Sequence, residues 1–124
     1  FVIGSRKKNK SRFHKYLINE VGANILTYIF NFLFNSNFTD VASCYKLIRT
    51  SKIKDISLKT NGFDLDYEIA SKLVKNNISH GEVAINYSSR SFKEGRKSFL
   101  KKDNIYMDGM KGLLVMIKVR FFNY

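Results

Sequence analysis

The chain has 124 residues, a formal net charge of +12 and one cysteine, Cys44. Its 44% hydrophobic and 15% aromatic residues exclude a disordered tail and suffice for one domain with a buried core. A lone cysteine excludes an intrachain disulfide and a cysteine-based metal site, and it predicts a small, partly buried thiol in a reducing compartment. The positive charge favours an anionic partner: nucleic acid, an anionic lipid surface or phosphate groups.

Residues 1–4 form an apolar run that predicts a short buried strand ending at Gly4. No initiator methionine or basic segment precedes the run, so it is not a signal peptide. A domain rarely opens with the end of a buried strand, and we therefore expect a fragment whose missing N-terminal part pairs with Phe1–Ile3. The segment Ser5–Lys15 is a basic loop, either simply solvated or a site for phosphate or lipid headgroups; its cations are Arg6, Lys7, Lys8, Lys10, Arg12 and Lys15.

Residues 16–35 predict a helix. Apolar side chains cover most of its circumference, and Asn24, Thr27 and Asn31 form one narrow polar stripe at spacings of three and four. The apolar run from Val21 to Phe34 is too short to span a membrane. The helix is therefore expected to be buried or to lie at a bilayer interface.

The middle of the chain predicts a turn, a strand and two helices. The turn covers residues 39–44, the strand residues 45–49 and a brief helix residues 51–56. Asp64 is suited to cap a second helix that Asn76 and Asn77 close. Its core stripe is expected to be Leu65, Ile69 and Leu73.

The segment Glu82–Ser98 begins as a strand and continues as a basic loop. Val83, Ile85 and Tyr87 alternate with more polar residues through position 87, the period of a half-buried strand. The loop carries four cations around the flexible joint Gly95: Arg90, Lys93, Arg96 and Lys97. It is either a solvated hairpin or a mobile loop that closes on a phosphate-rich ligand.

The last helix is expected to start at Asp103 or Asp108. One face carries Tyr106, Met110, Leu113, Ile117 and Phe121, which predicts either a core stripe or an interfacial segment. Gly109 and Gly112 each cost about 1 kcal/mol of helix stability against alanine, so close packing or a bend is expected there. Strands and helices alternate along the chain, which predicts an α/β layer on a mostly parallel sheet with flanking helices.

Several common chemistries are not supported by the residues. The chain lacks the glycine-rich phosphate-binding motifs and the nucleophile elbow. His14 and His80 have no metal-ligand partner at motif spacing, and helix capping explains Asp64 better than metal binding does. The cations lie in two loops while the aromatic residues lie in apolar stripes, which disfavours a nucleic-acid partner.

Five segments in fixed order resemble glycosyltransferase family 2, in particular the polyprenol-phosphate sugar transferases of the dolichol-phosphate mannosyltransferase type. They are Gly4-Ser5-Arg6, Thr39 to Arg49, Asn61 to Glu68, Glu82 to Tyr87, and Arg90 with Glu94-Gly95-Arg96-Lys97. The match covers the C-terminal half of that family's catalytic domain. Val83-Ala84-Ile85 departs from the usual Val-Pro-Ile, which relaxes the strand edge and removes no chemistry.

The resemblance implies the C-terminal, acceptor-side part of a GT-A fold, with the nucleotide-binding half and its Asp-x-Asp metal motif before Phe1. It implies transfer of a hexose with inversion, from a nucleotide sugar to a polyprenyl phosphate at the cytosolic membrane face. The implied cofactor is Mg²⁺ or Mn²⁺, with ligands outside this chain. No catalytic residue is assigned.

The resemblance also implies roles for individual residues. Arg6 would bind the acceptor phosphate, helped by Arg12 or Lys15, and Asp40 and Lys46 would line the acceptor pocket. The loop that closes over the donor diphosphate would carry Arg90, Arg96 and Lys97. Two other functions stay open: a family 2 enzyme with a glycan acceptor, and a non-enzymatic basic module that binds RNA or a membrane.

Overall fold

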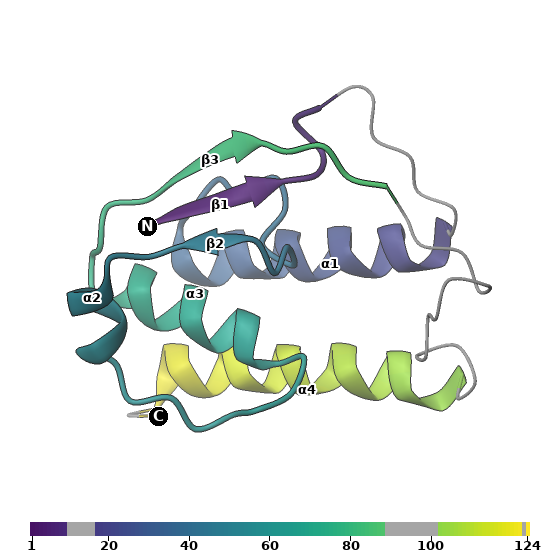
Figure 1. Cartoon of the computed structure of the whole chain (residues 1–124). Coiled ribbons are helices and arrows are strands. Elements are labelled where there is room, and N and C mark those ends of the chain that lie inside the picture. Colours follow the sequence, from purple (N-terminus) through teal and green to yellow (C-terminus); the bar gives the residue numbers. More distant parts are fainter. Residues whose placement is uncertain (10–16, 89–101, 123) are drawn as a thin grey trace.

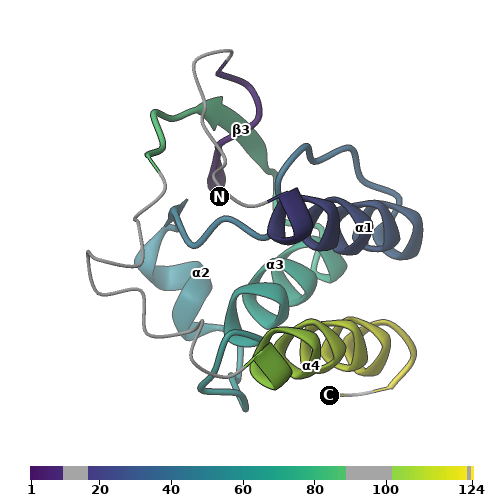
Figure 2. The same ribbon diagram turned by 90° about the vertical axis from the view of Figure 1, so that its right-hand side faces the viewer.

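The computed structural model describes residues 1–9, 17–88, 102–122 and 124. In Figure 1 a small sheet lies above α3, and two long helices, α1 and α4, run in the same direction along the molecule. Figure 2 looks along these two helices and shows them next to each other, away from α2. In chain order the elements are β1 (Val2–Ser5), α1 (Leu17–Phe34), β2 (Lys46–Leu47), α2 (Thr50–Lys54), α3 (Leu65–Lys75), β3 (Gly81–Ala84) and α4 (Lys102–Phe121).

The sheet has the strand order β2-β1-β3 and is mixed. β1 pairs in parallel with β3, from Val2 opposite Gly81 to Ser5 opposite Ala84, and antiparallel with β2. The described part of the chain is thus α/β as predicted, but a mostly parallel sheet is not shown. The expectation that β1 pairs with strands outside the chain is wrong, because both of its neighbours come from this chain.

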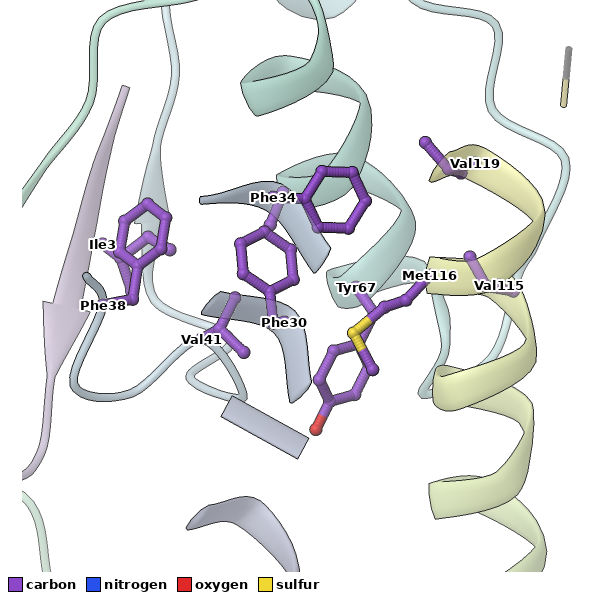
Figure 3. Packing of buried hydrophobic residues seen from close by; sticks show 10 residues of the cluster. Ile3, Phe30, Phe34, Phe38, Val41, Tyr67, Val115, Met116 and Val119 are labelled. Carbon is purple, nitrogen blue, oxygen red and sulfur yellow. The ribbon is translucent and has the colours of Figure 1, made fainter. Parts of the chain in front are cut away.

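The core lies between the sheet and the helices. Figure 3 shows Ile3 of β1 and Phe38 on one side, Phe30 and Phe34 of α1 in the centre, and Val115, Met116 and Val119 of α4 on the other. Ile3, Phe30 and Met116 are fully buried. Each such side chain stabilises the fold by about 1.5–3 kcal/mol through removal of apolar surface from water.

Helix α1 has the predicted extent, but of its polar stripe only Asn24 is exposed. Thr27 is buried, and Asn31 binds the loop that follows the helix through hydrogen bonds with the backbone of Phe38 at 2.8 and 3.0 Å. Instead, α1 exposes an apolar row that includes Tyr28 and Phe32. Interaction with its own loop therefore decides which side of α1 is buried.

Helix α4 exposes three of the five residues expected to form its core stripe, namely Tyr106, Met110 and Phe121. Leu113 packs against the core and Ile117 is half-buried. The buried face is instead Gly112, Val115, Met116 and Val119. A Cβ at Gly112 would lie 2.8 Å from Cδ2 of Tyr67, so this glycine lets α4 approach α3, which confirms the predicted close packing at Gly112.

The shorter elements differ from the predictions in detail. Asp64 occupies the N-cap position of α3 but makes no side-chain capping hydrogen bond there. Leu73 is buried as predicted, whereas Leu65 and Ile69 are only half-buried. Strand β3 ends at Ala84 and not at Tyr87. Among the described residues, no helix combines the length and apolarity needed to cross a bilayer.

Candidate anion-binding site

The carboxyl ends of β1 and β3 bring charged residues from distant parts of the sequence to one corner of the molecule. In Figure 1 both strands point toward the end of the molecule at which α1 and α4 begin. Arg6 follows β1, Tyr87 comes shortly after β3, and the loop 39–45 lies against both strands. Ligands of α/β proteins usually bind beyond the carboxyl ends of parallel strands, so this corner is the candidate site.

Arg6 is held by Asp40 in a bidentate ion pair. Nε of Arg6 donates to Oδ2 at 2.7 Å and Nη2 to Oδ1 at 2.8 Å, and the backbone N–H of Arg6 donates to Oδ2 at 3.1 Å. The Asp40 side chain is 1% exposed and that of Arg6 20%. The hydrogen bond with Asp40 raises the pKa of Arg6, which keeps the guanidinium charged. The guanidinium also lies 5.3 Å from the ring centroid of Tyr87.

Glu82 fixes the loop that carries Asp40. Its carboxylate accepts from the backbone N–H of Thr39 at 2.9 and 3.0 Å, from Thr39 Oγ1 at 2.9 Å and from the backbone N–H of Asp40 at 3.0 Å. It also lies 3.6 Å from Nζ of Lys8, and its side chain is 4% exposed. Glu82 therefore sets the position of Asp40, and through Asp40 that of Arg6.

Lys46 forms the second buried cation of the corner. Its Nζ donates to Oδ1 of Asp66 at 2.9 Å and to the carbonyls of Val41 and Ser43, and its side chain is 4% exposed. These contacts tie β2, the loop before it and the start of α3 together. They also leave the ammonium fully paired, with its charge balanced by Asp66 and without a free donor.

The pKa of the Cys44 thiol is shifted by the charged groups of this corner and by desolvation. Desolvation and a hydrogen bond with Asp66 raise the pKa of the thiol to about 11, although the positive charges of Lys46 and Arg6 act to lower it. The residue is exposed, contrary to the expectation of a partly buried cysteine. It is thus an accessible thiol that ionises unusually late.

The structure brings together three of the eight residues proposed to bind phosphate. Arg6, Asp40 and Lys46 meet at the corner. Each of the two cations is already paired with a carboxylate, which the sequence did not indicate. The other five lie outside the described residues; they are Arg12, Lys15, Arg90, Arg96 and Lys97.

The sequence analysis did not assign Glu82, Asp66 and Tyr87 to the site. Glu82 and Tyr87 are the first and last residues of one of the family-like segments, so the resemblance could have pointed to them. No signal in the sequence pointed to Asp66, because its partner Lys46 is twenty residues away. Partners this distant are visible only after the chain has folded.

The described carboxylates do not fit a divalent cation. Asp40, Asp66 and Glu82 each have a cationic partner. Within the described ranges no group of three or more histidine, cysteine, aspartate or glutamate side chains could hold a metal ion. The Mg²⁺ or Mn²⁺ implied by the resemblance therefore has no site in this part of the chain.

A second polar cluster lies away from this corner. Glu68 is fully buried and accepts from Lys72 Nζ at 2.6 Å, Thr60 Oγ1 at 2.6 Å and the backbone N–H of Thr60 at 2.9 Å. Lys72 also lines a cavity of about 280 Å³ with Tyr124. The cluster joins α3 to the loop before it, and its groups satisfy one another.

Comparison with family models, with curated proteins and with solved structures finds no match to this chain.

Proposed function

We propose that this chain is the acceptor-side part of an inverting glycosyltransferase that moves a hexose from a nucleotide sugar to a polyprenyl phosphate at the cytosolic face of a membrane. One observation carries the proposal. Arg6, Asp40 and Lys46 belong to two of the family-like segments and share one corner, where Glu82, from a third, holds the loop of Asp40. Three segments that are distant in sequence thus meet at one corner, which supports the proposal.

Arg6 is suited to bind a phosphate monoester. The pair with Asp40 uses two of the five N–H groups of the guanidinium, and part of the side chain remains exposed. A planar guanidinium that is already oriented binds phosphate with little further loss of side-chain entropy. Asp40 would therefore orient Arg6 and would not itself contact the ligand.

Lys46 would act by position, because its ion pair with Asp66 ties β2 to the start of α3 beside the corner. Two anionic substrates repel each other, and the guanidinium of Arg6 supplies the donors that would meet the acceptor phosphate. A phosphate acceptor is already ionised at neutral pH, so the reaction does not require a strong general base. None of the described residues assigned to the corner is a histidine, which suits this chemistry.

The test is a transfer assay with the full-length protein that carries this sequence. We expect labelled hexose to move from a nucleotide sugar to a short-chain polyprenyl phosphate dispersed in detergent. Transfer to a free glycan and not to the lipid would instead support a family 2 enzyme with a glycan acceptor. Absence of transfer, together with sequence-general RNA binding that weakens steeply with salt, would support a basic binding module.

A further inference from the structure

Helix α1 carries an exposed apolar row from Val21 to Phe32. Val21, Ile25, Tyr28 and Phe32 recur at spacings of four and three, and their exposed fractions rise from 46% at Val21 to 81% at Phe32. These spacings place the four side chains on one face of a helix. No described part of the chain covers this face, and four exposed apolar side chains in a row are unusual on a protein surface.

Helix α4 carries a second such row beside the first. Tyr106, Met110, Leu114 and Phe121 are each 48–67% exposed. α1 and α4 pack along each other, and a Cβ at Gly109 would lie 3.9 Å from Leu26. Both helices run in the same direction on one side of the molecule (Figure 2). We name the two rows together the α1/α4 face.

The half-buried side chains between the rows are also apolar. Helical spacing places Ile29 of α1 and Ile117 of α4 next to the side on which the two helices contact each other. The two rows therefore belong to one continuous apolar surface. Its area spans several turns of both helices, more than a scatter of single exposed residues.

The charges around the α1/α4 face are positive. On the described parts of both helices the exposed charged side chains are Lys111, Lys118 and Arg120, whereas the acidic Glu20 and Asp108 are half-buried. Long basic side chains beside an apolar face reach anionic headgroups while their stems stay in the apolar region. Aromatic residues such as Tyr28 and Tyr106 suit the same depth.

A lipid surface fits this pattern better than a second copy of the chain. Two copies that met through this face would bring together two molecules with a formal charge of +12 each. An anionic bilayer instead neutralises those charges and covers the apolar rows. Neither helix can cross a bilayer, so contact must be made with the helices lying flat.

We propose that the α1/α4 face docks on an anionic lipid bilayer, with both helices lying in the plane of the interface. The proposal deepens the proposed function and rests on it only for the lipid nature of the acceptor. Both helices begin at the end of the molecule toward which β1 and β3 point, so the α1/α4 face starts at the same end as the corner with Arg6 (Figure 1).

Vesicle co-sedimentation of the full-length protein tests the proposal. The probe is a vesicle of phosphatidylcholine with about one third phosphatidylglycerol, and a vesicle of phosphatidylcholine alone measures the charge dependence. The test variant Phe32→Ser/Leu114→Ser removes one aromatic and one aliphatic side chain from the face. The control Phe63→Ser/Leu47→Ser removes the same types from exposed positions outside it.

We expect the test variant to lower partitioning onto anionic vesicles by at least about tenfold and the control to change it less than about twofold. Circular dichroism must show both variants folded. Equal partitioning of the two variants would overturn the proposal. So would a wild-type dimer in solution that the test variant converts to a monomer, because the face would then be a protein interface.

The proposed function can fail separately. Vesicle binding without sugar transfer to a detergent-dispersed acceptor would reject the enzyme and keep the docking face. Sugar transfer without vesicle binding that depends on the α1/α4 face would reject the docking face and keep the enzyme.

Discussion

Four carboxylates of the described chain each hold a cation in place, and three of them also accept hydrogen bonds from backbone N–H groups. Asp40 holds Arg6, Asp66 holds Lys46, Glu68 holds Lys72 and Glu82 holds Lys8. The chain as a whole has far more cations than acids, so these carboxylates are scarce. Their placement decides which cations are fixed and which remain available to a ligand.

The Asp40–Arg6 pair should be important for stability. Asp40→Asn should lower the free energy of unfolding by about 2–4 kcal/mol, because it leaves a largely buried guanidinium without its charged partner. The control is Asp55→Asn, which removes one partner of an exposed pair with Lys52 and should cost at most about 0.5 kcal/mol. Urea denaturation of both variants measures the difference, and similar losses would show that the Asp40 pair is no more than a surface contact.

Glu68 should make stability depend on acid pH. Burial alone would raise the pKa of Glu68, but hydrogen bonds from Lys72 and Thr60 outweigh it and lower the pKa below the ordinary value. A lowered pKa stabilises the fold above the unfolded-state pKa of about 4.3, and this contribution is lost as the pH falls through the folded-state pKa.

Comparison with Glu68→Gln isolates that contribution. We expect the variant to be less stable than the wild type by about 2–4 kcal/mol at pH 7. The difference should be similar at pH 5.5 and should shrink below about pH 4.3 as Glu68 of the wild type becomes protonated. A difference that stays constant down to pH 3 would contradict the assigned pKa shift.

Cys44 should react slowly despite its exposure. With a pKa of about 11 its thiolate population at pH 8 is roughly two orders of magnitude below that of an ordinary cysteine. Reaction with a thiol-specific disulfide reagent should be slow in the folded protein and fast in urea. Asp66→Asn should accelerate the folded-state reaction, and an unchanged rate would contradict the role given to Asp66.

At the scale of elements, local sequence patterns predicted the helices better than the strands. The bounds of α1, α3 and α4 follow from apolar runs and end signals that lie within each helix. Strands β2 and β3 are shorter than predicted because pairing with β1, which is distant in sequence, limits their length. Periodicity cannot report where such pairing stops.

The buried face of α4 was not fixed by its sequence for a related reason. The face with Tyr106 and Phe121 was expected to be either a core stripe or an interfacial segment, and the core stripe is wrong. The core instead receives the face with Gly112, because a small residue allows α3 and α4 to approach closely. How closely the two helices pack depends on Tyr67 of α3. The apolar pattern within α4 carries no information about that residue.

Gly112→Ala tests that packing. The added Cβ would lie 2.8 and 2.9 Å from two ring carbons of Tyr67, so we expect a loss of about 1–3 kcal/mol in the free energy of unfolding. The control is Gly22→Ala in α1, where no heavy atom lies within 4 Å of the added Cβ and alanine should stabilise by up to about 1 kcal/mol. Thermal unfolding of the two variants should shift in opposite directions, and a stabilised Gly112→Ala protein would contradict the close α3–α4 contact.

At the scale of the whole molecule, the site and the α1/α4 face account for two different parts of the sequence. Arg6, which follows β1, and Glu82 of β3 both contribute to the corner through Asp40. The apolar rows of α1 and α4 lie outside the described core, which takes Phe30, Phe34, Val115 and Val119 from these helices. A protein that joins a phosphate site to a lipid surface needs both features.

The central claim is that Arg6 binds the phosphate of the lipid acceptor, and steady-state kinetics of Arg6→Gln tests it most directly. We expect kcat/KM for polyprenyl phosphate to fall by about 10–100-fold, because a charge-assisted hydrogen bond to phosphate is lost, while KM for the nucleotide sugar changes little. The control Arg49→Gln removes an exposed arginine beyond β2 and should leave both constants within about twofold. A folded Arg6→Gln enzyme with unchanged kcat/KM for the lipid acceptor would contradict the claim.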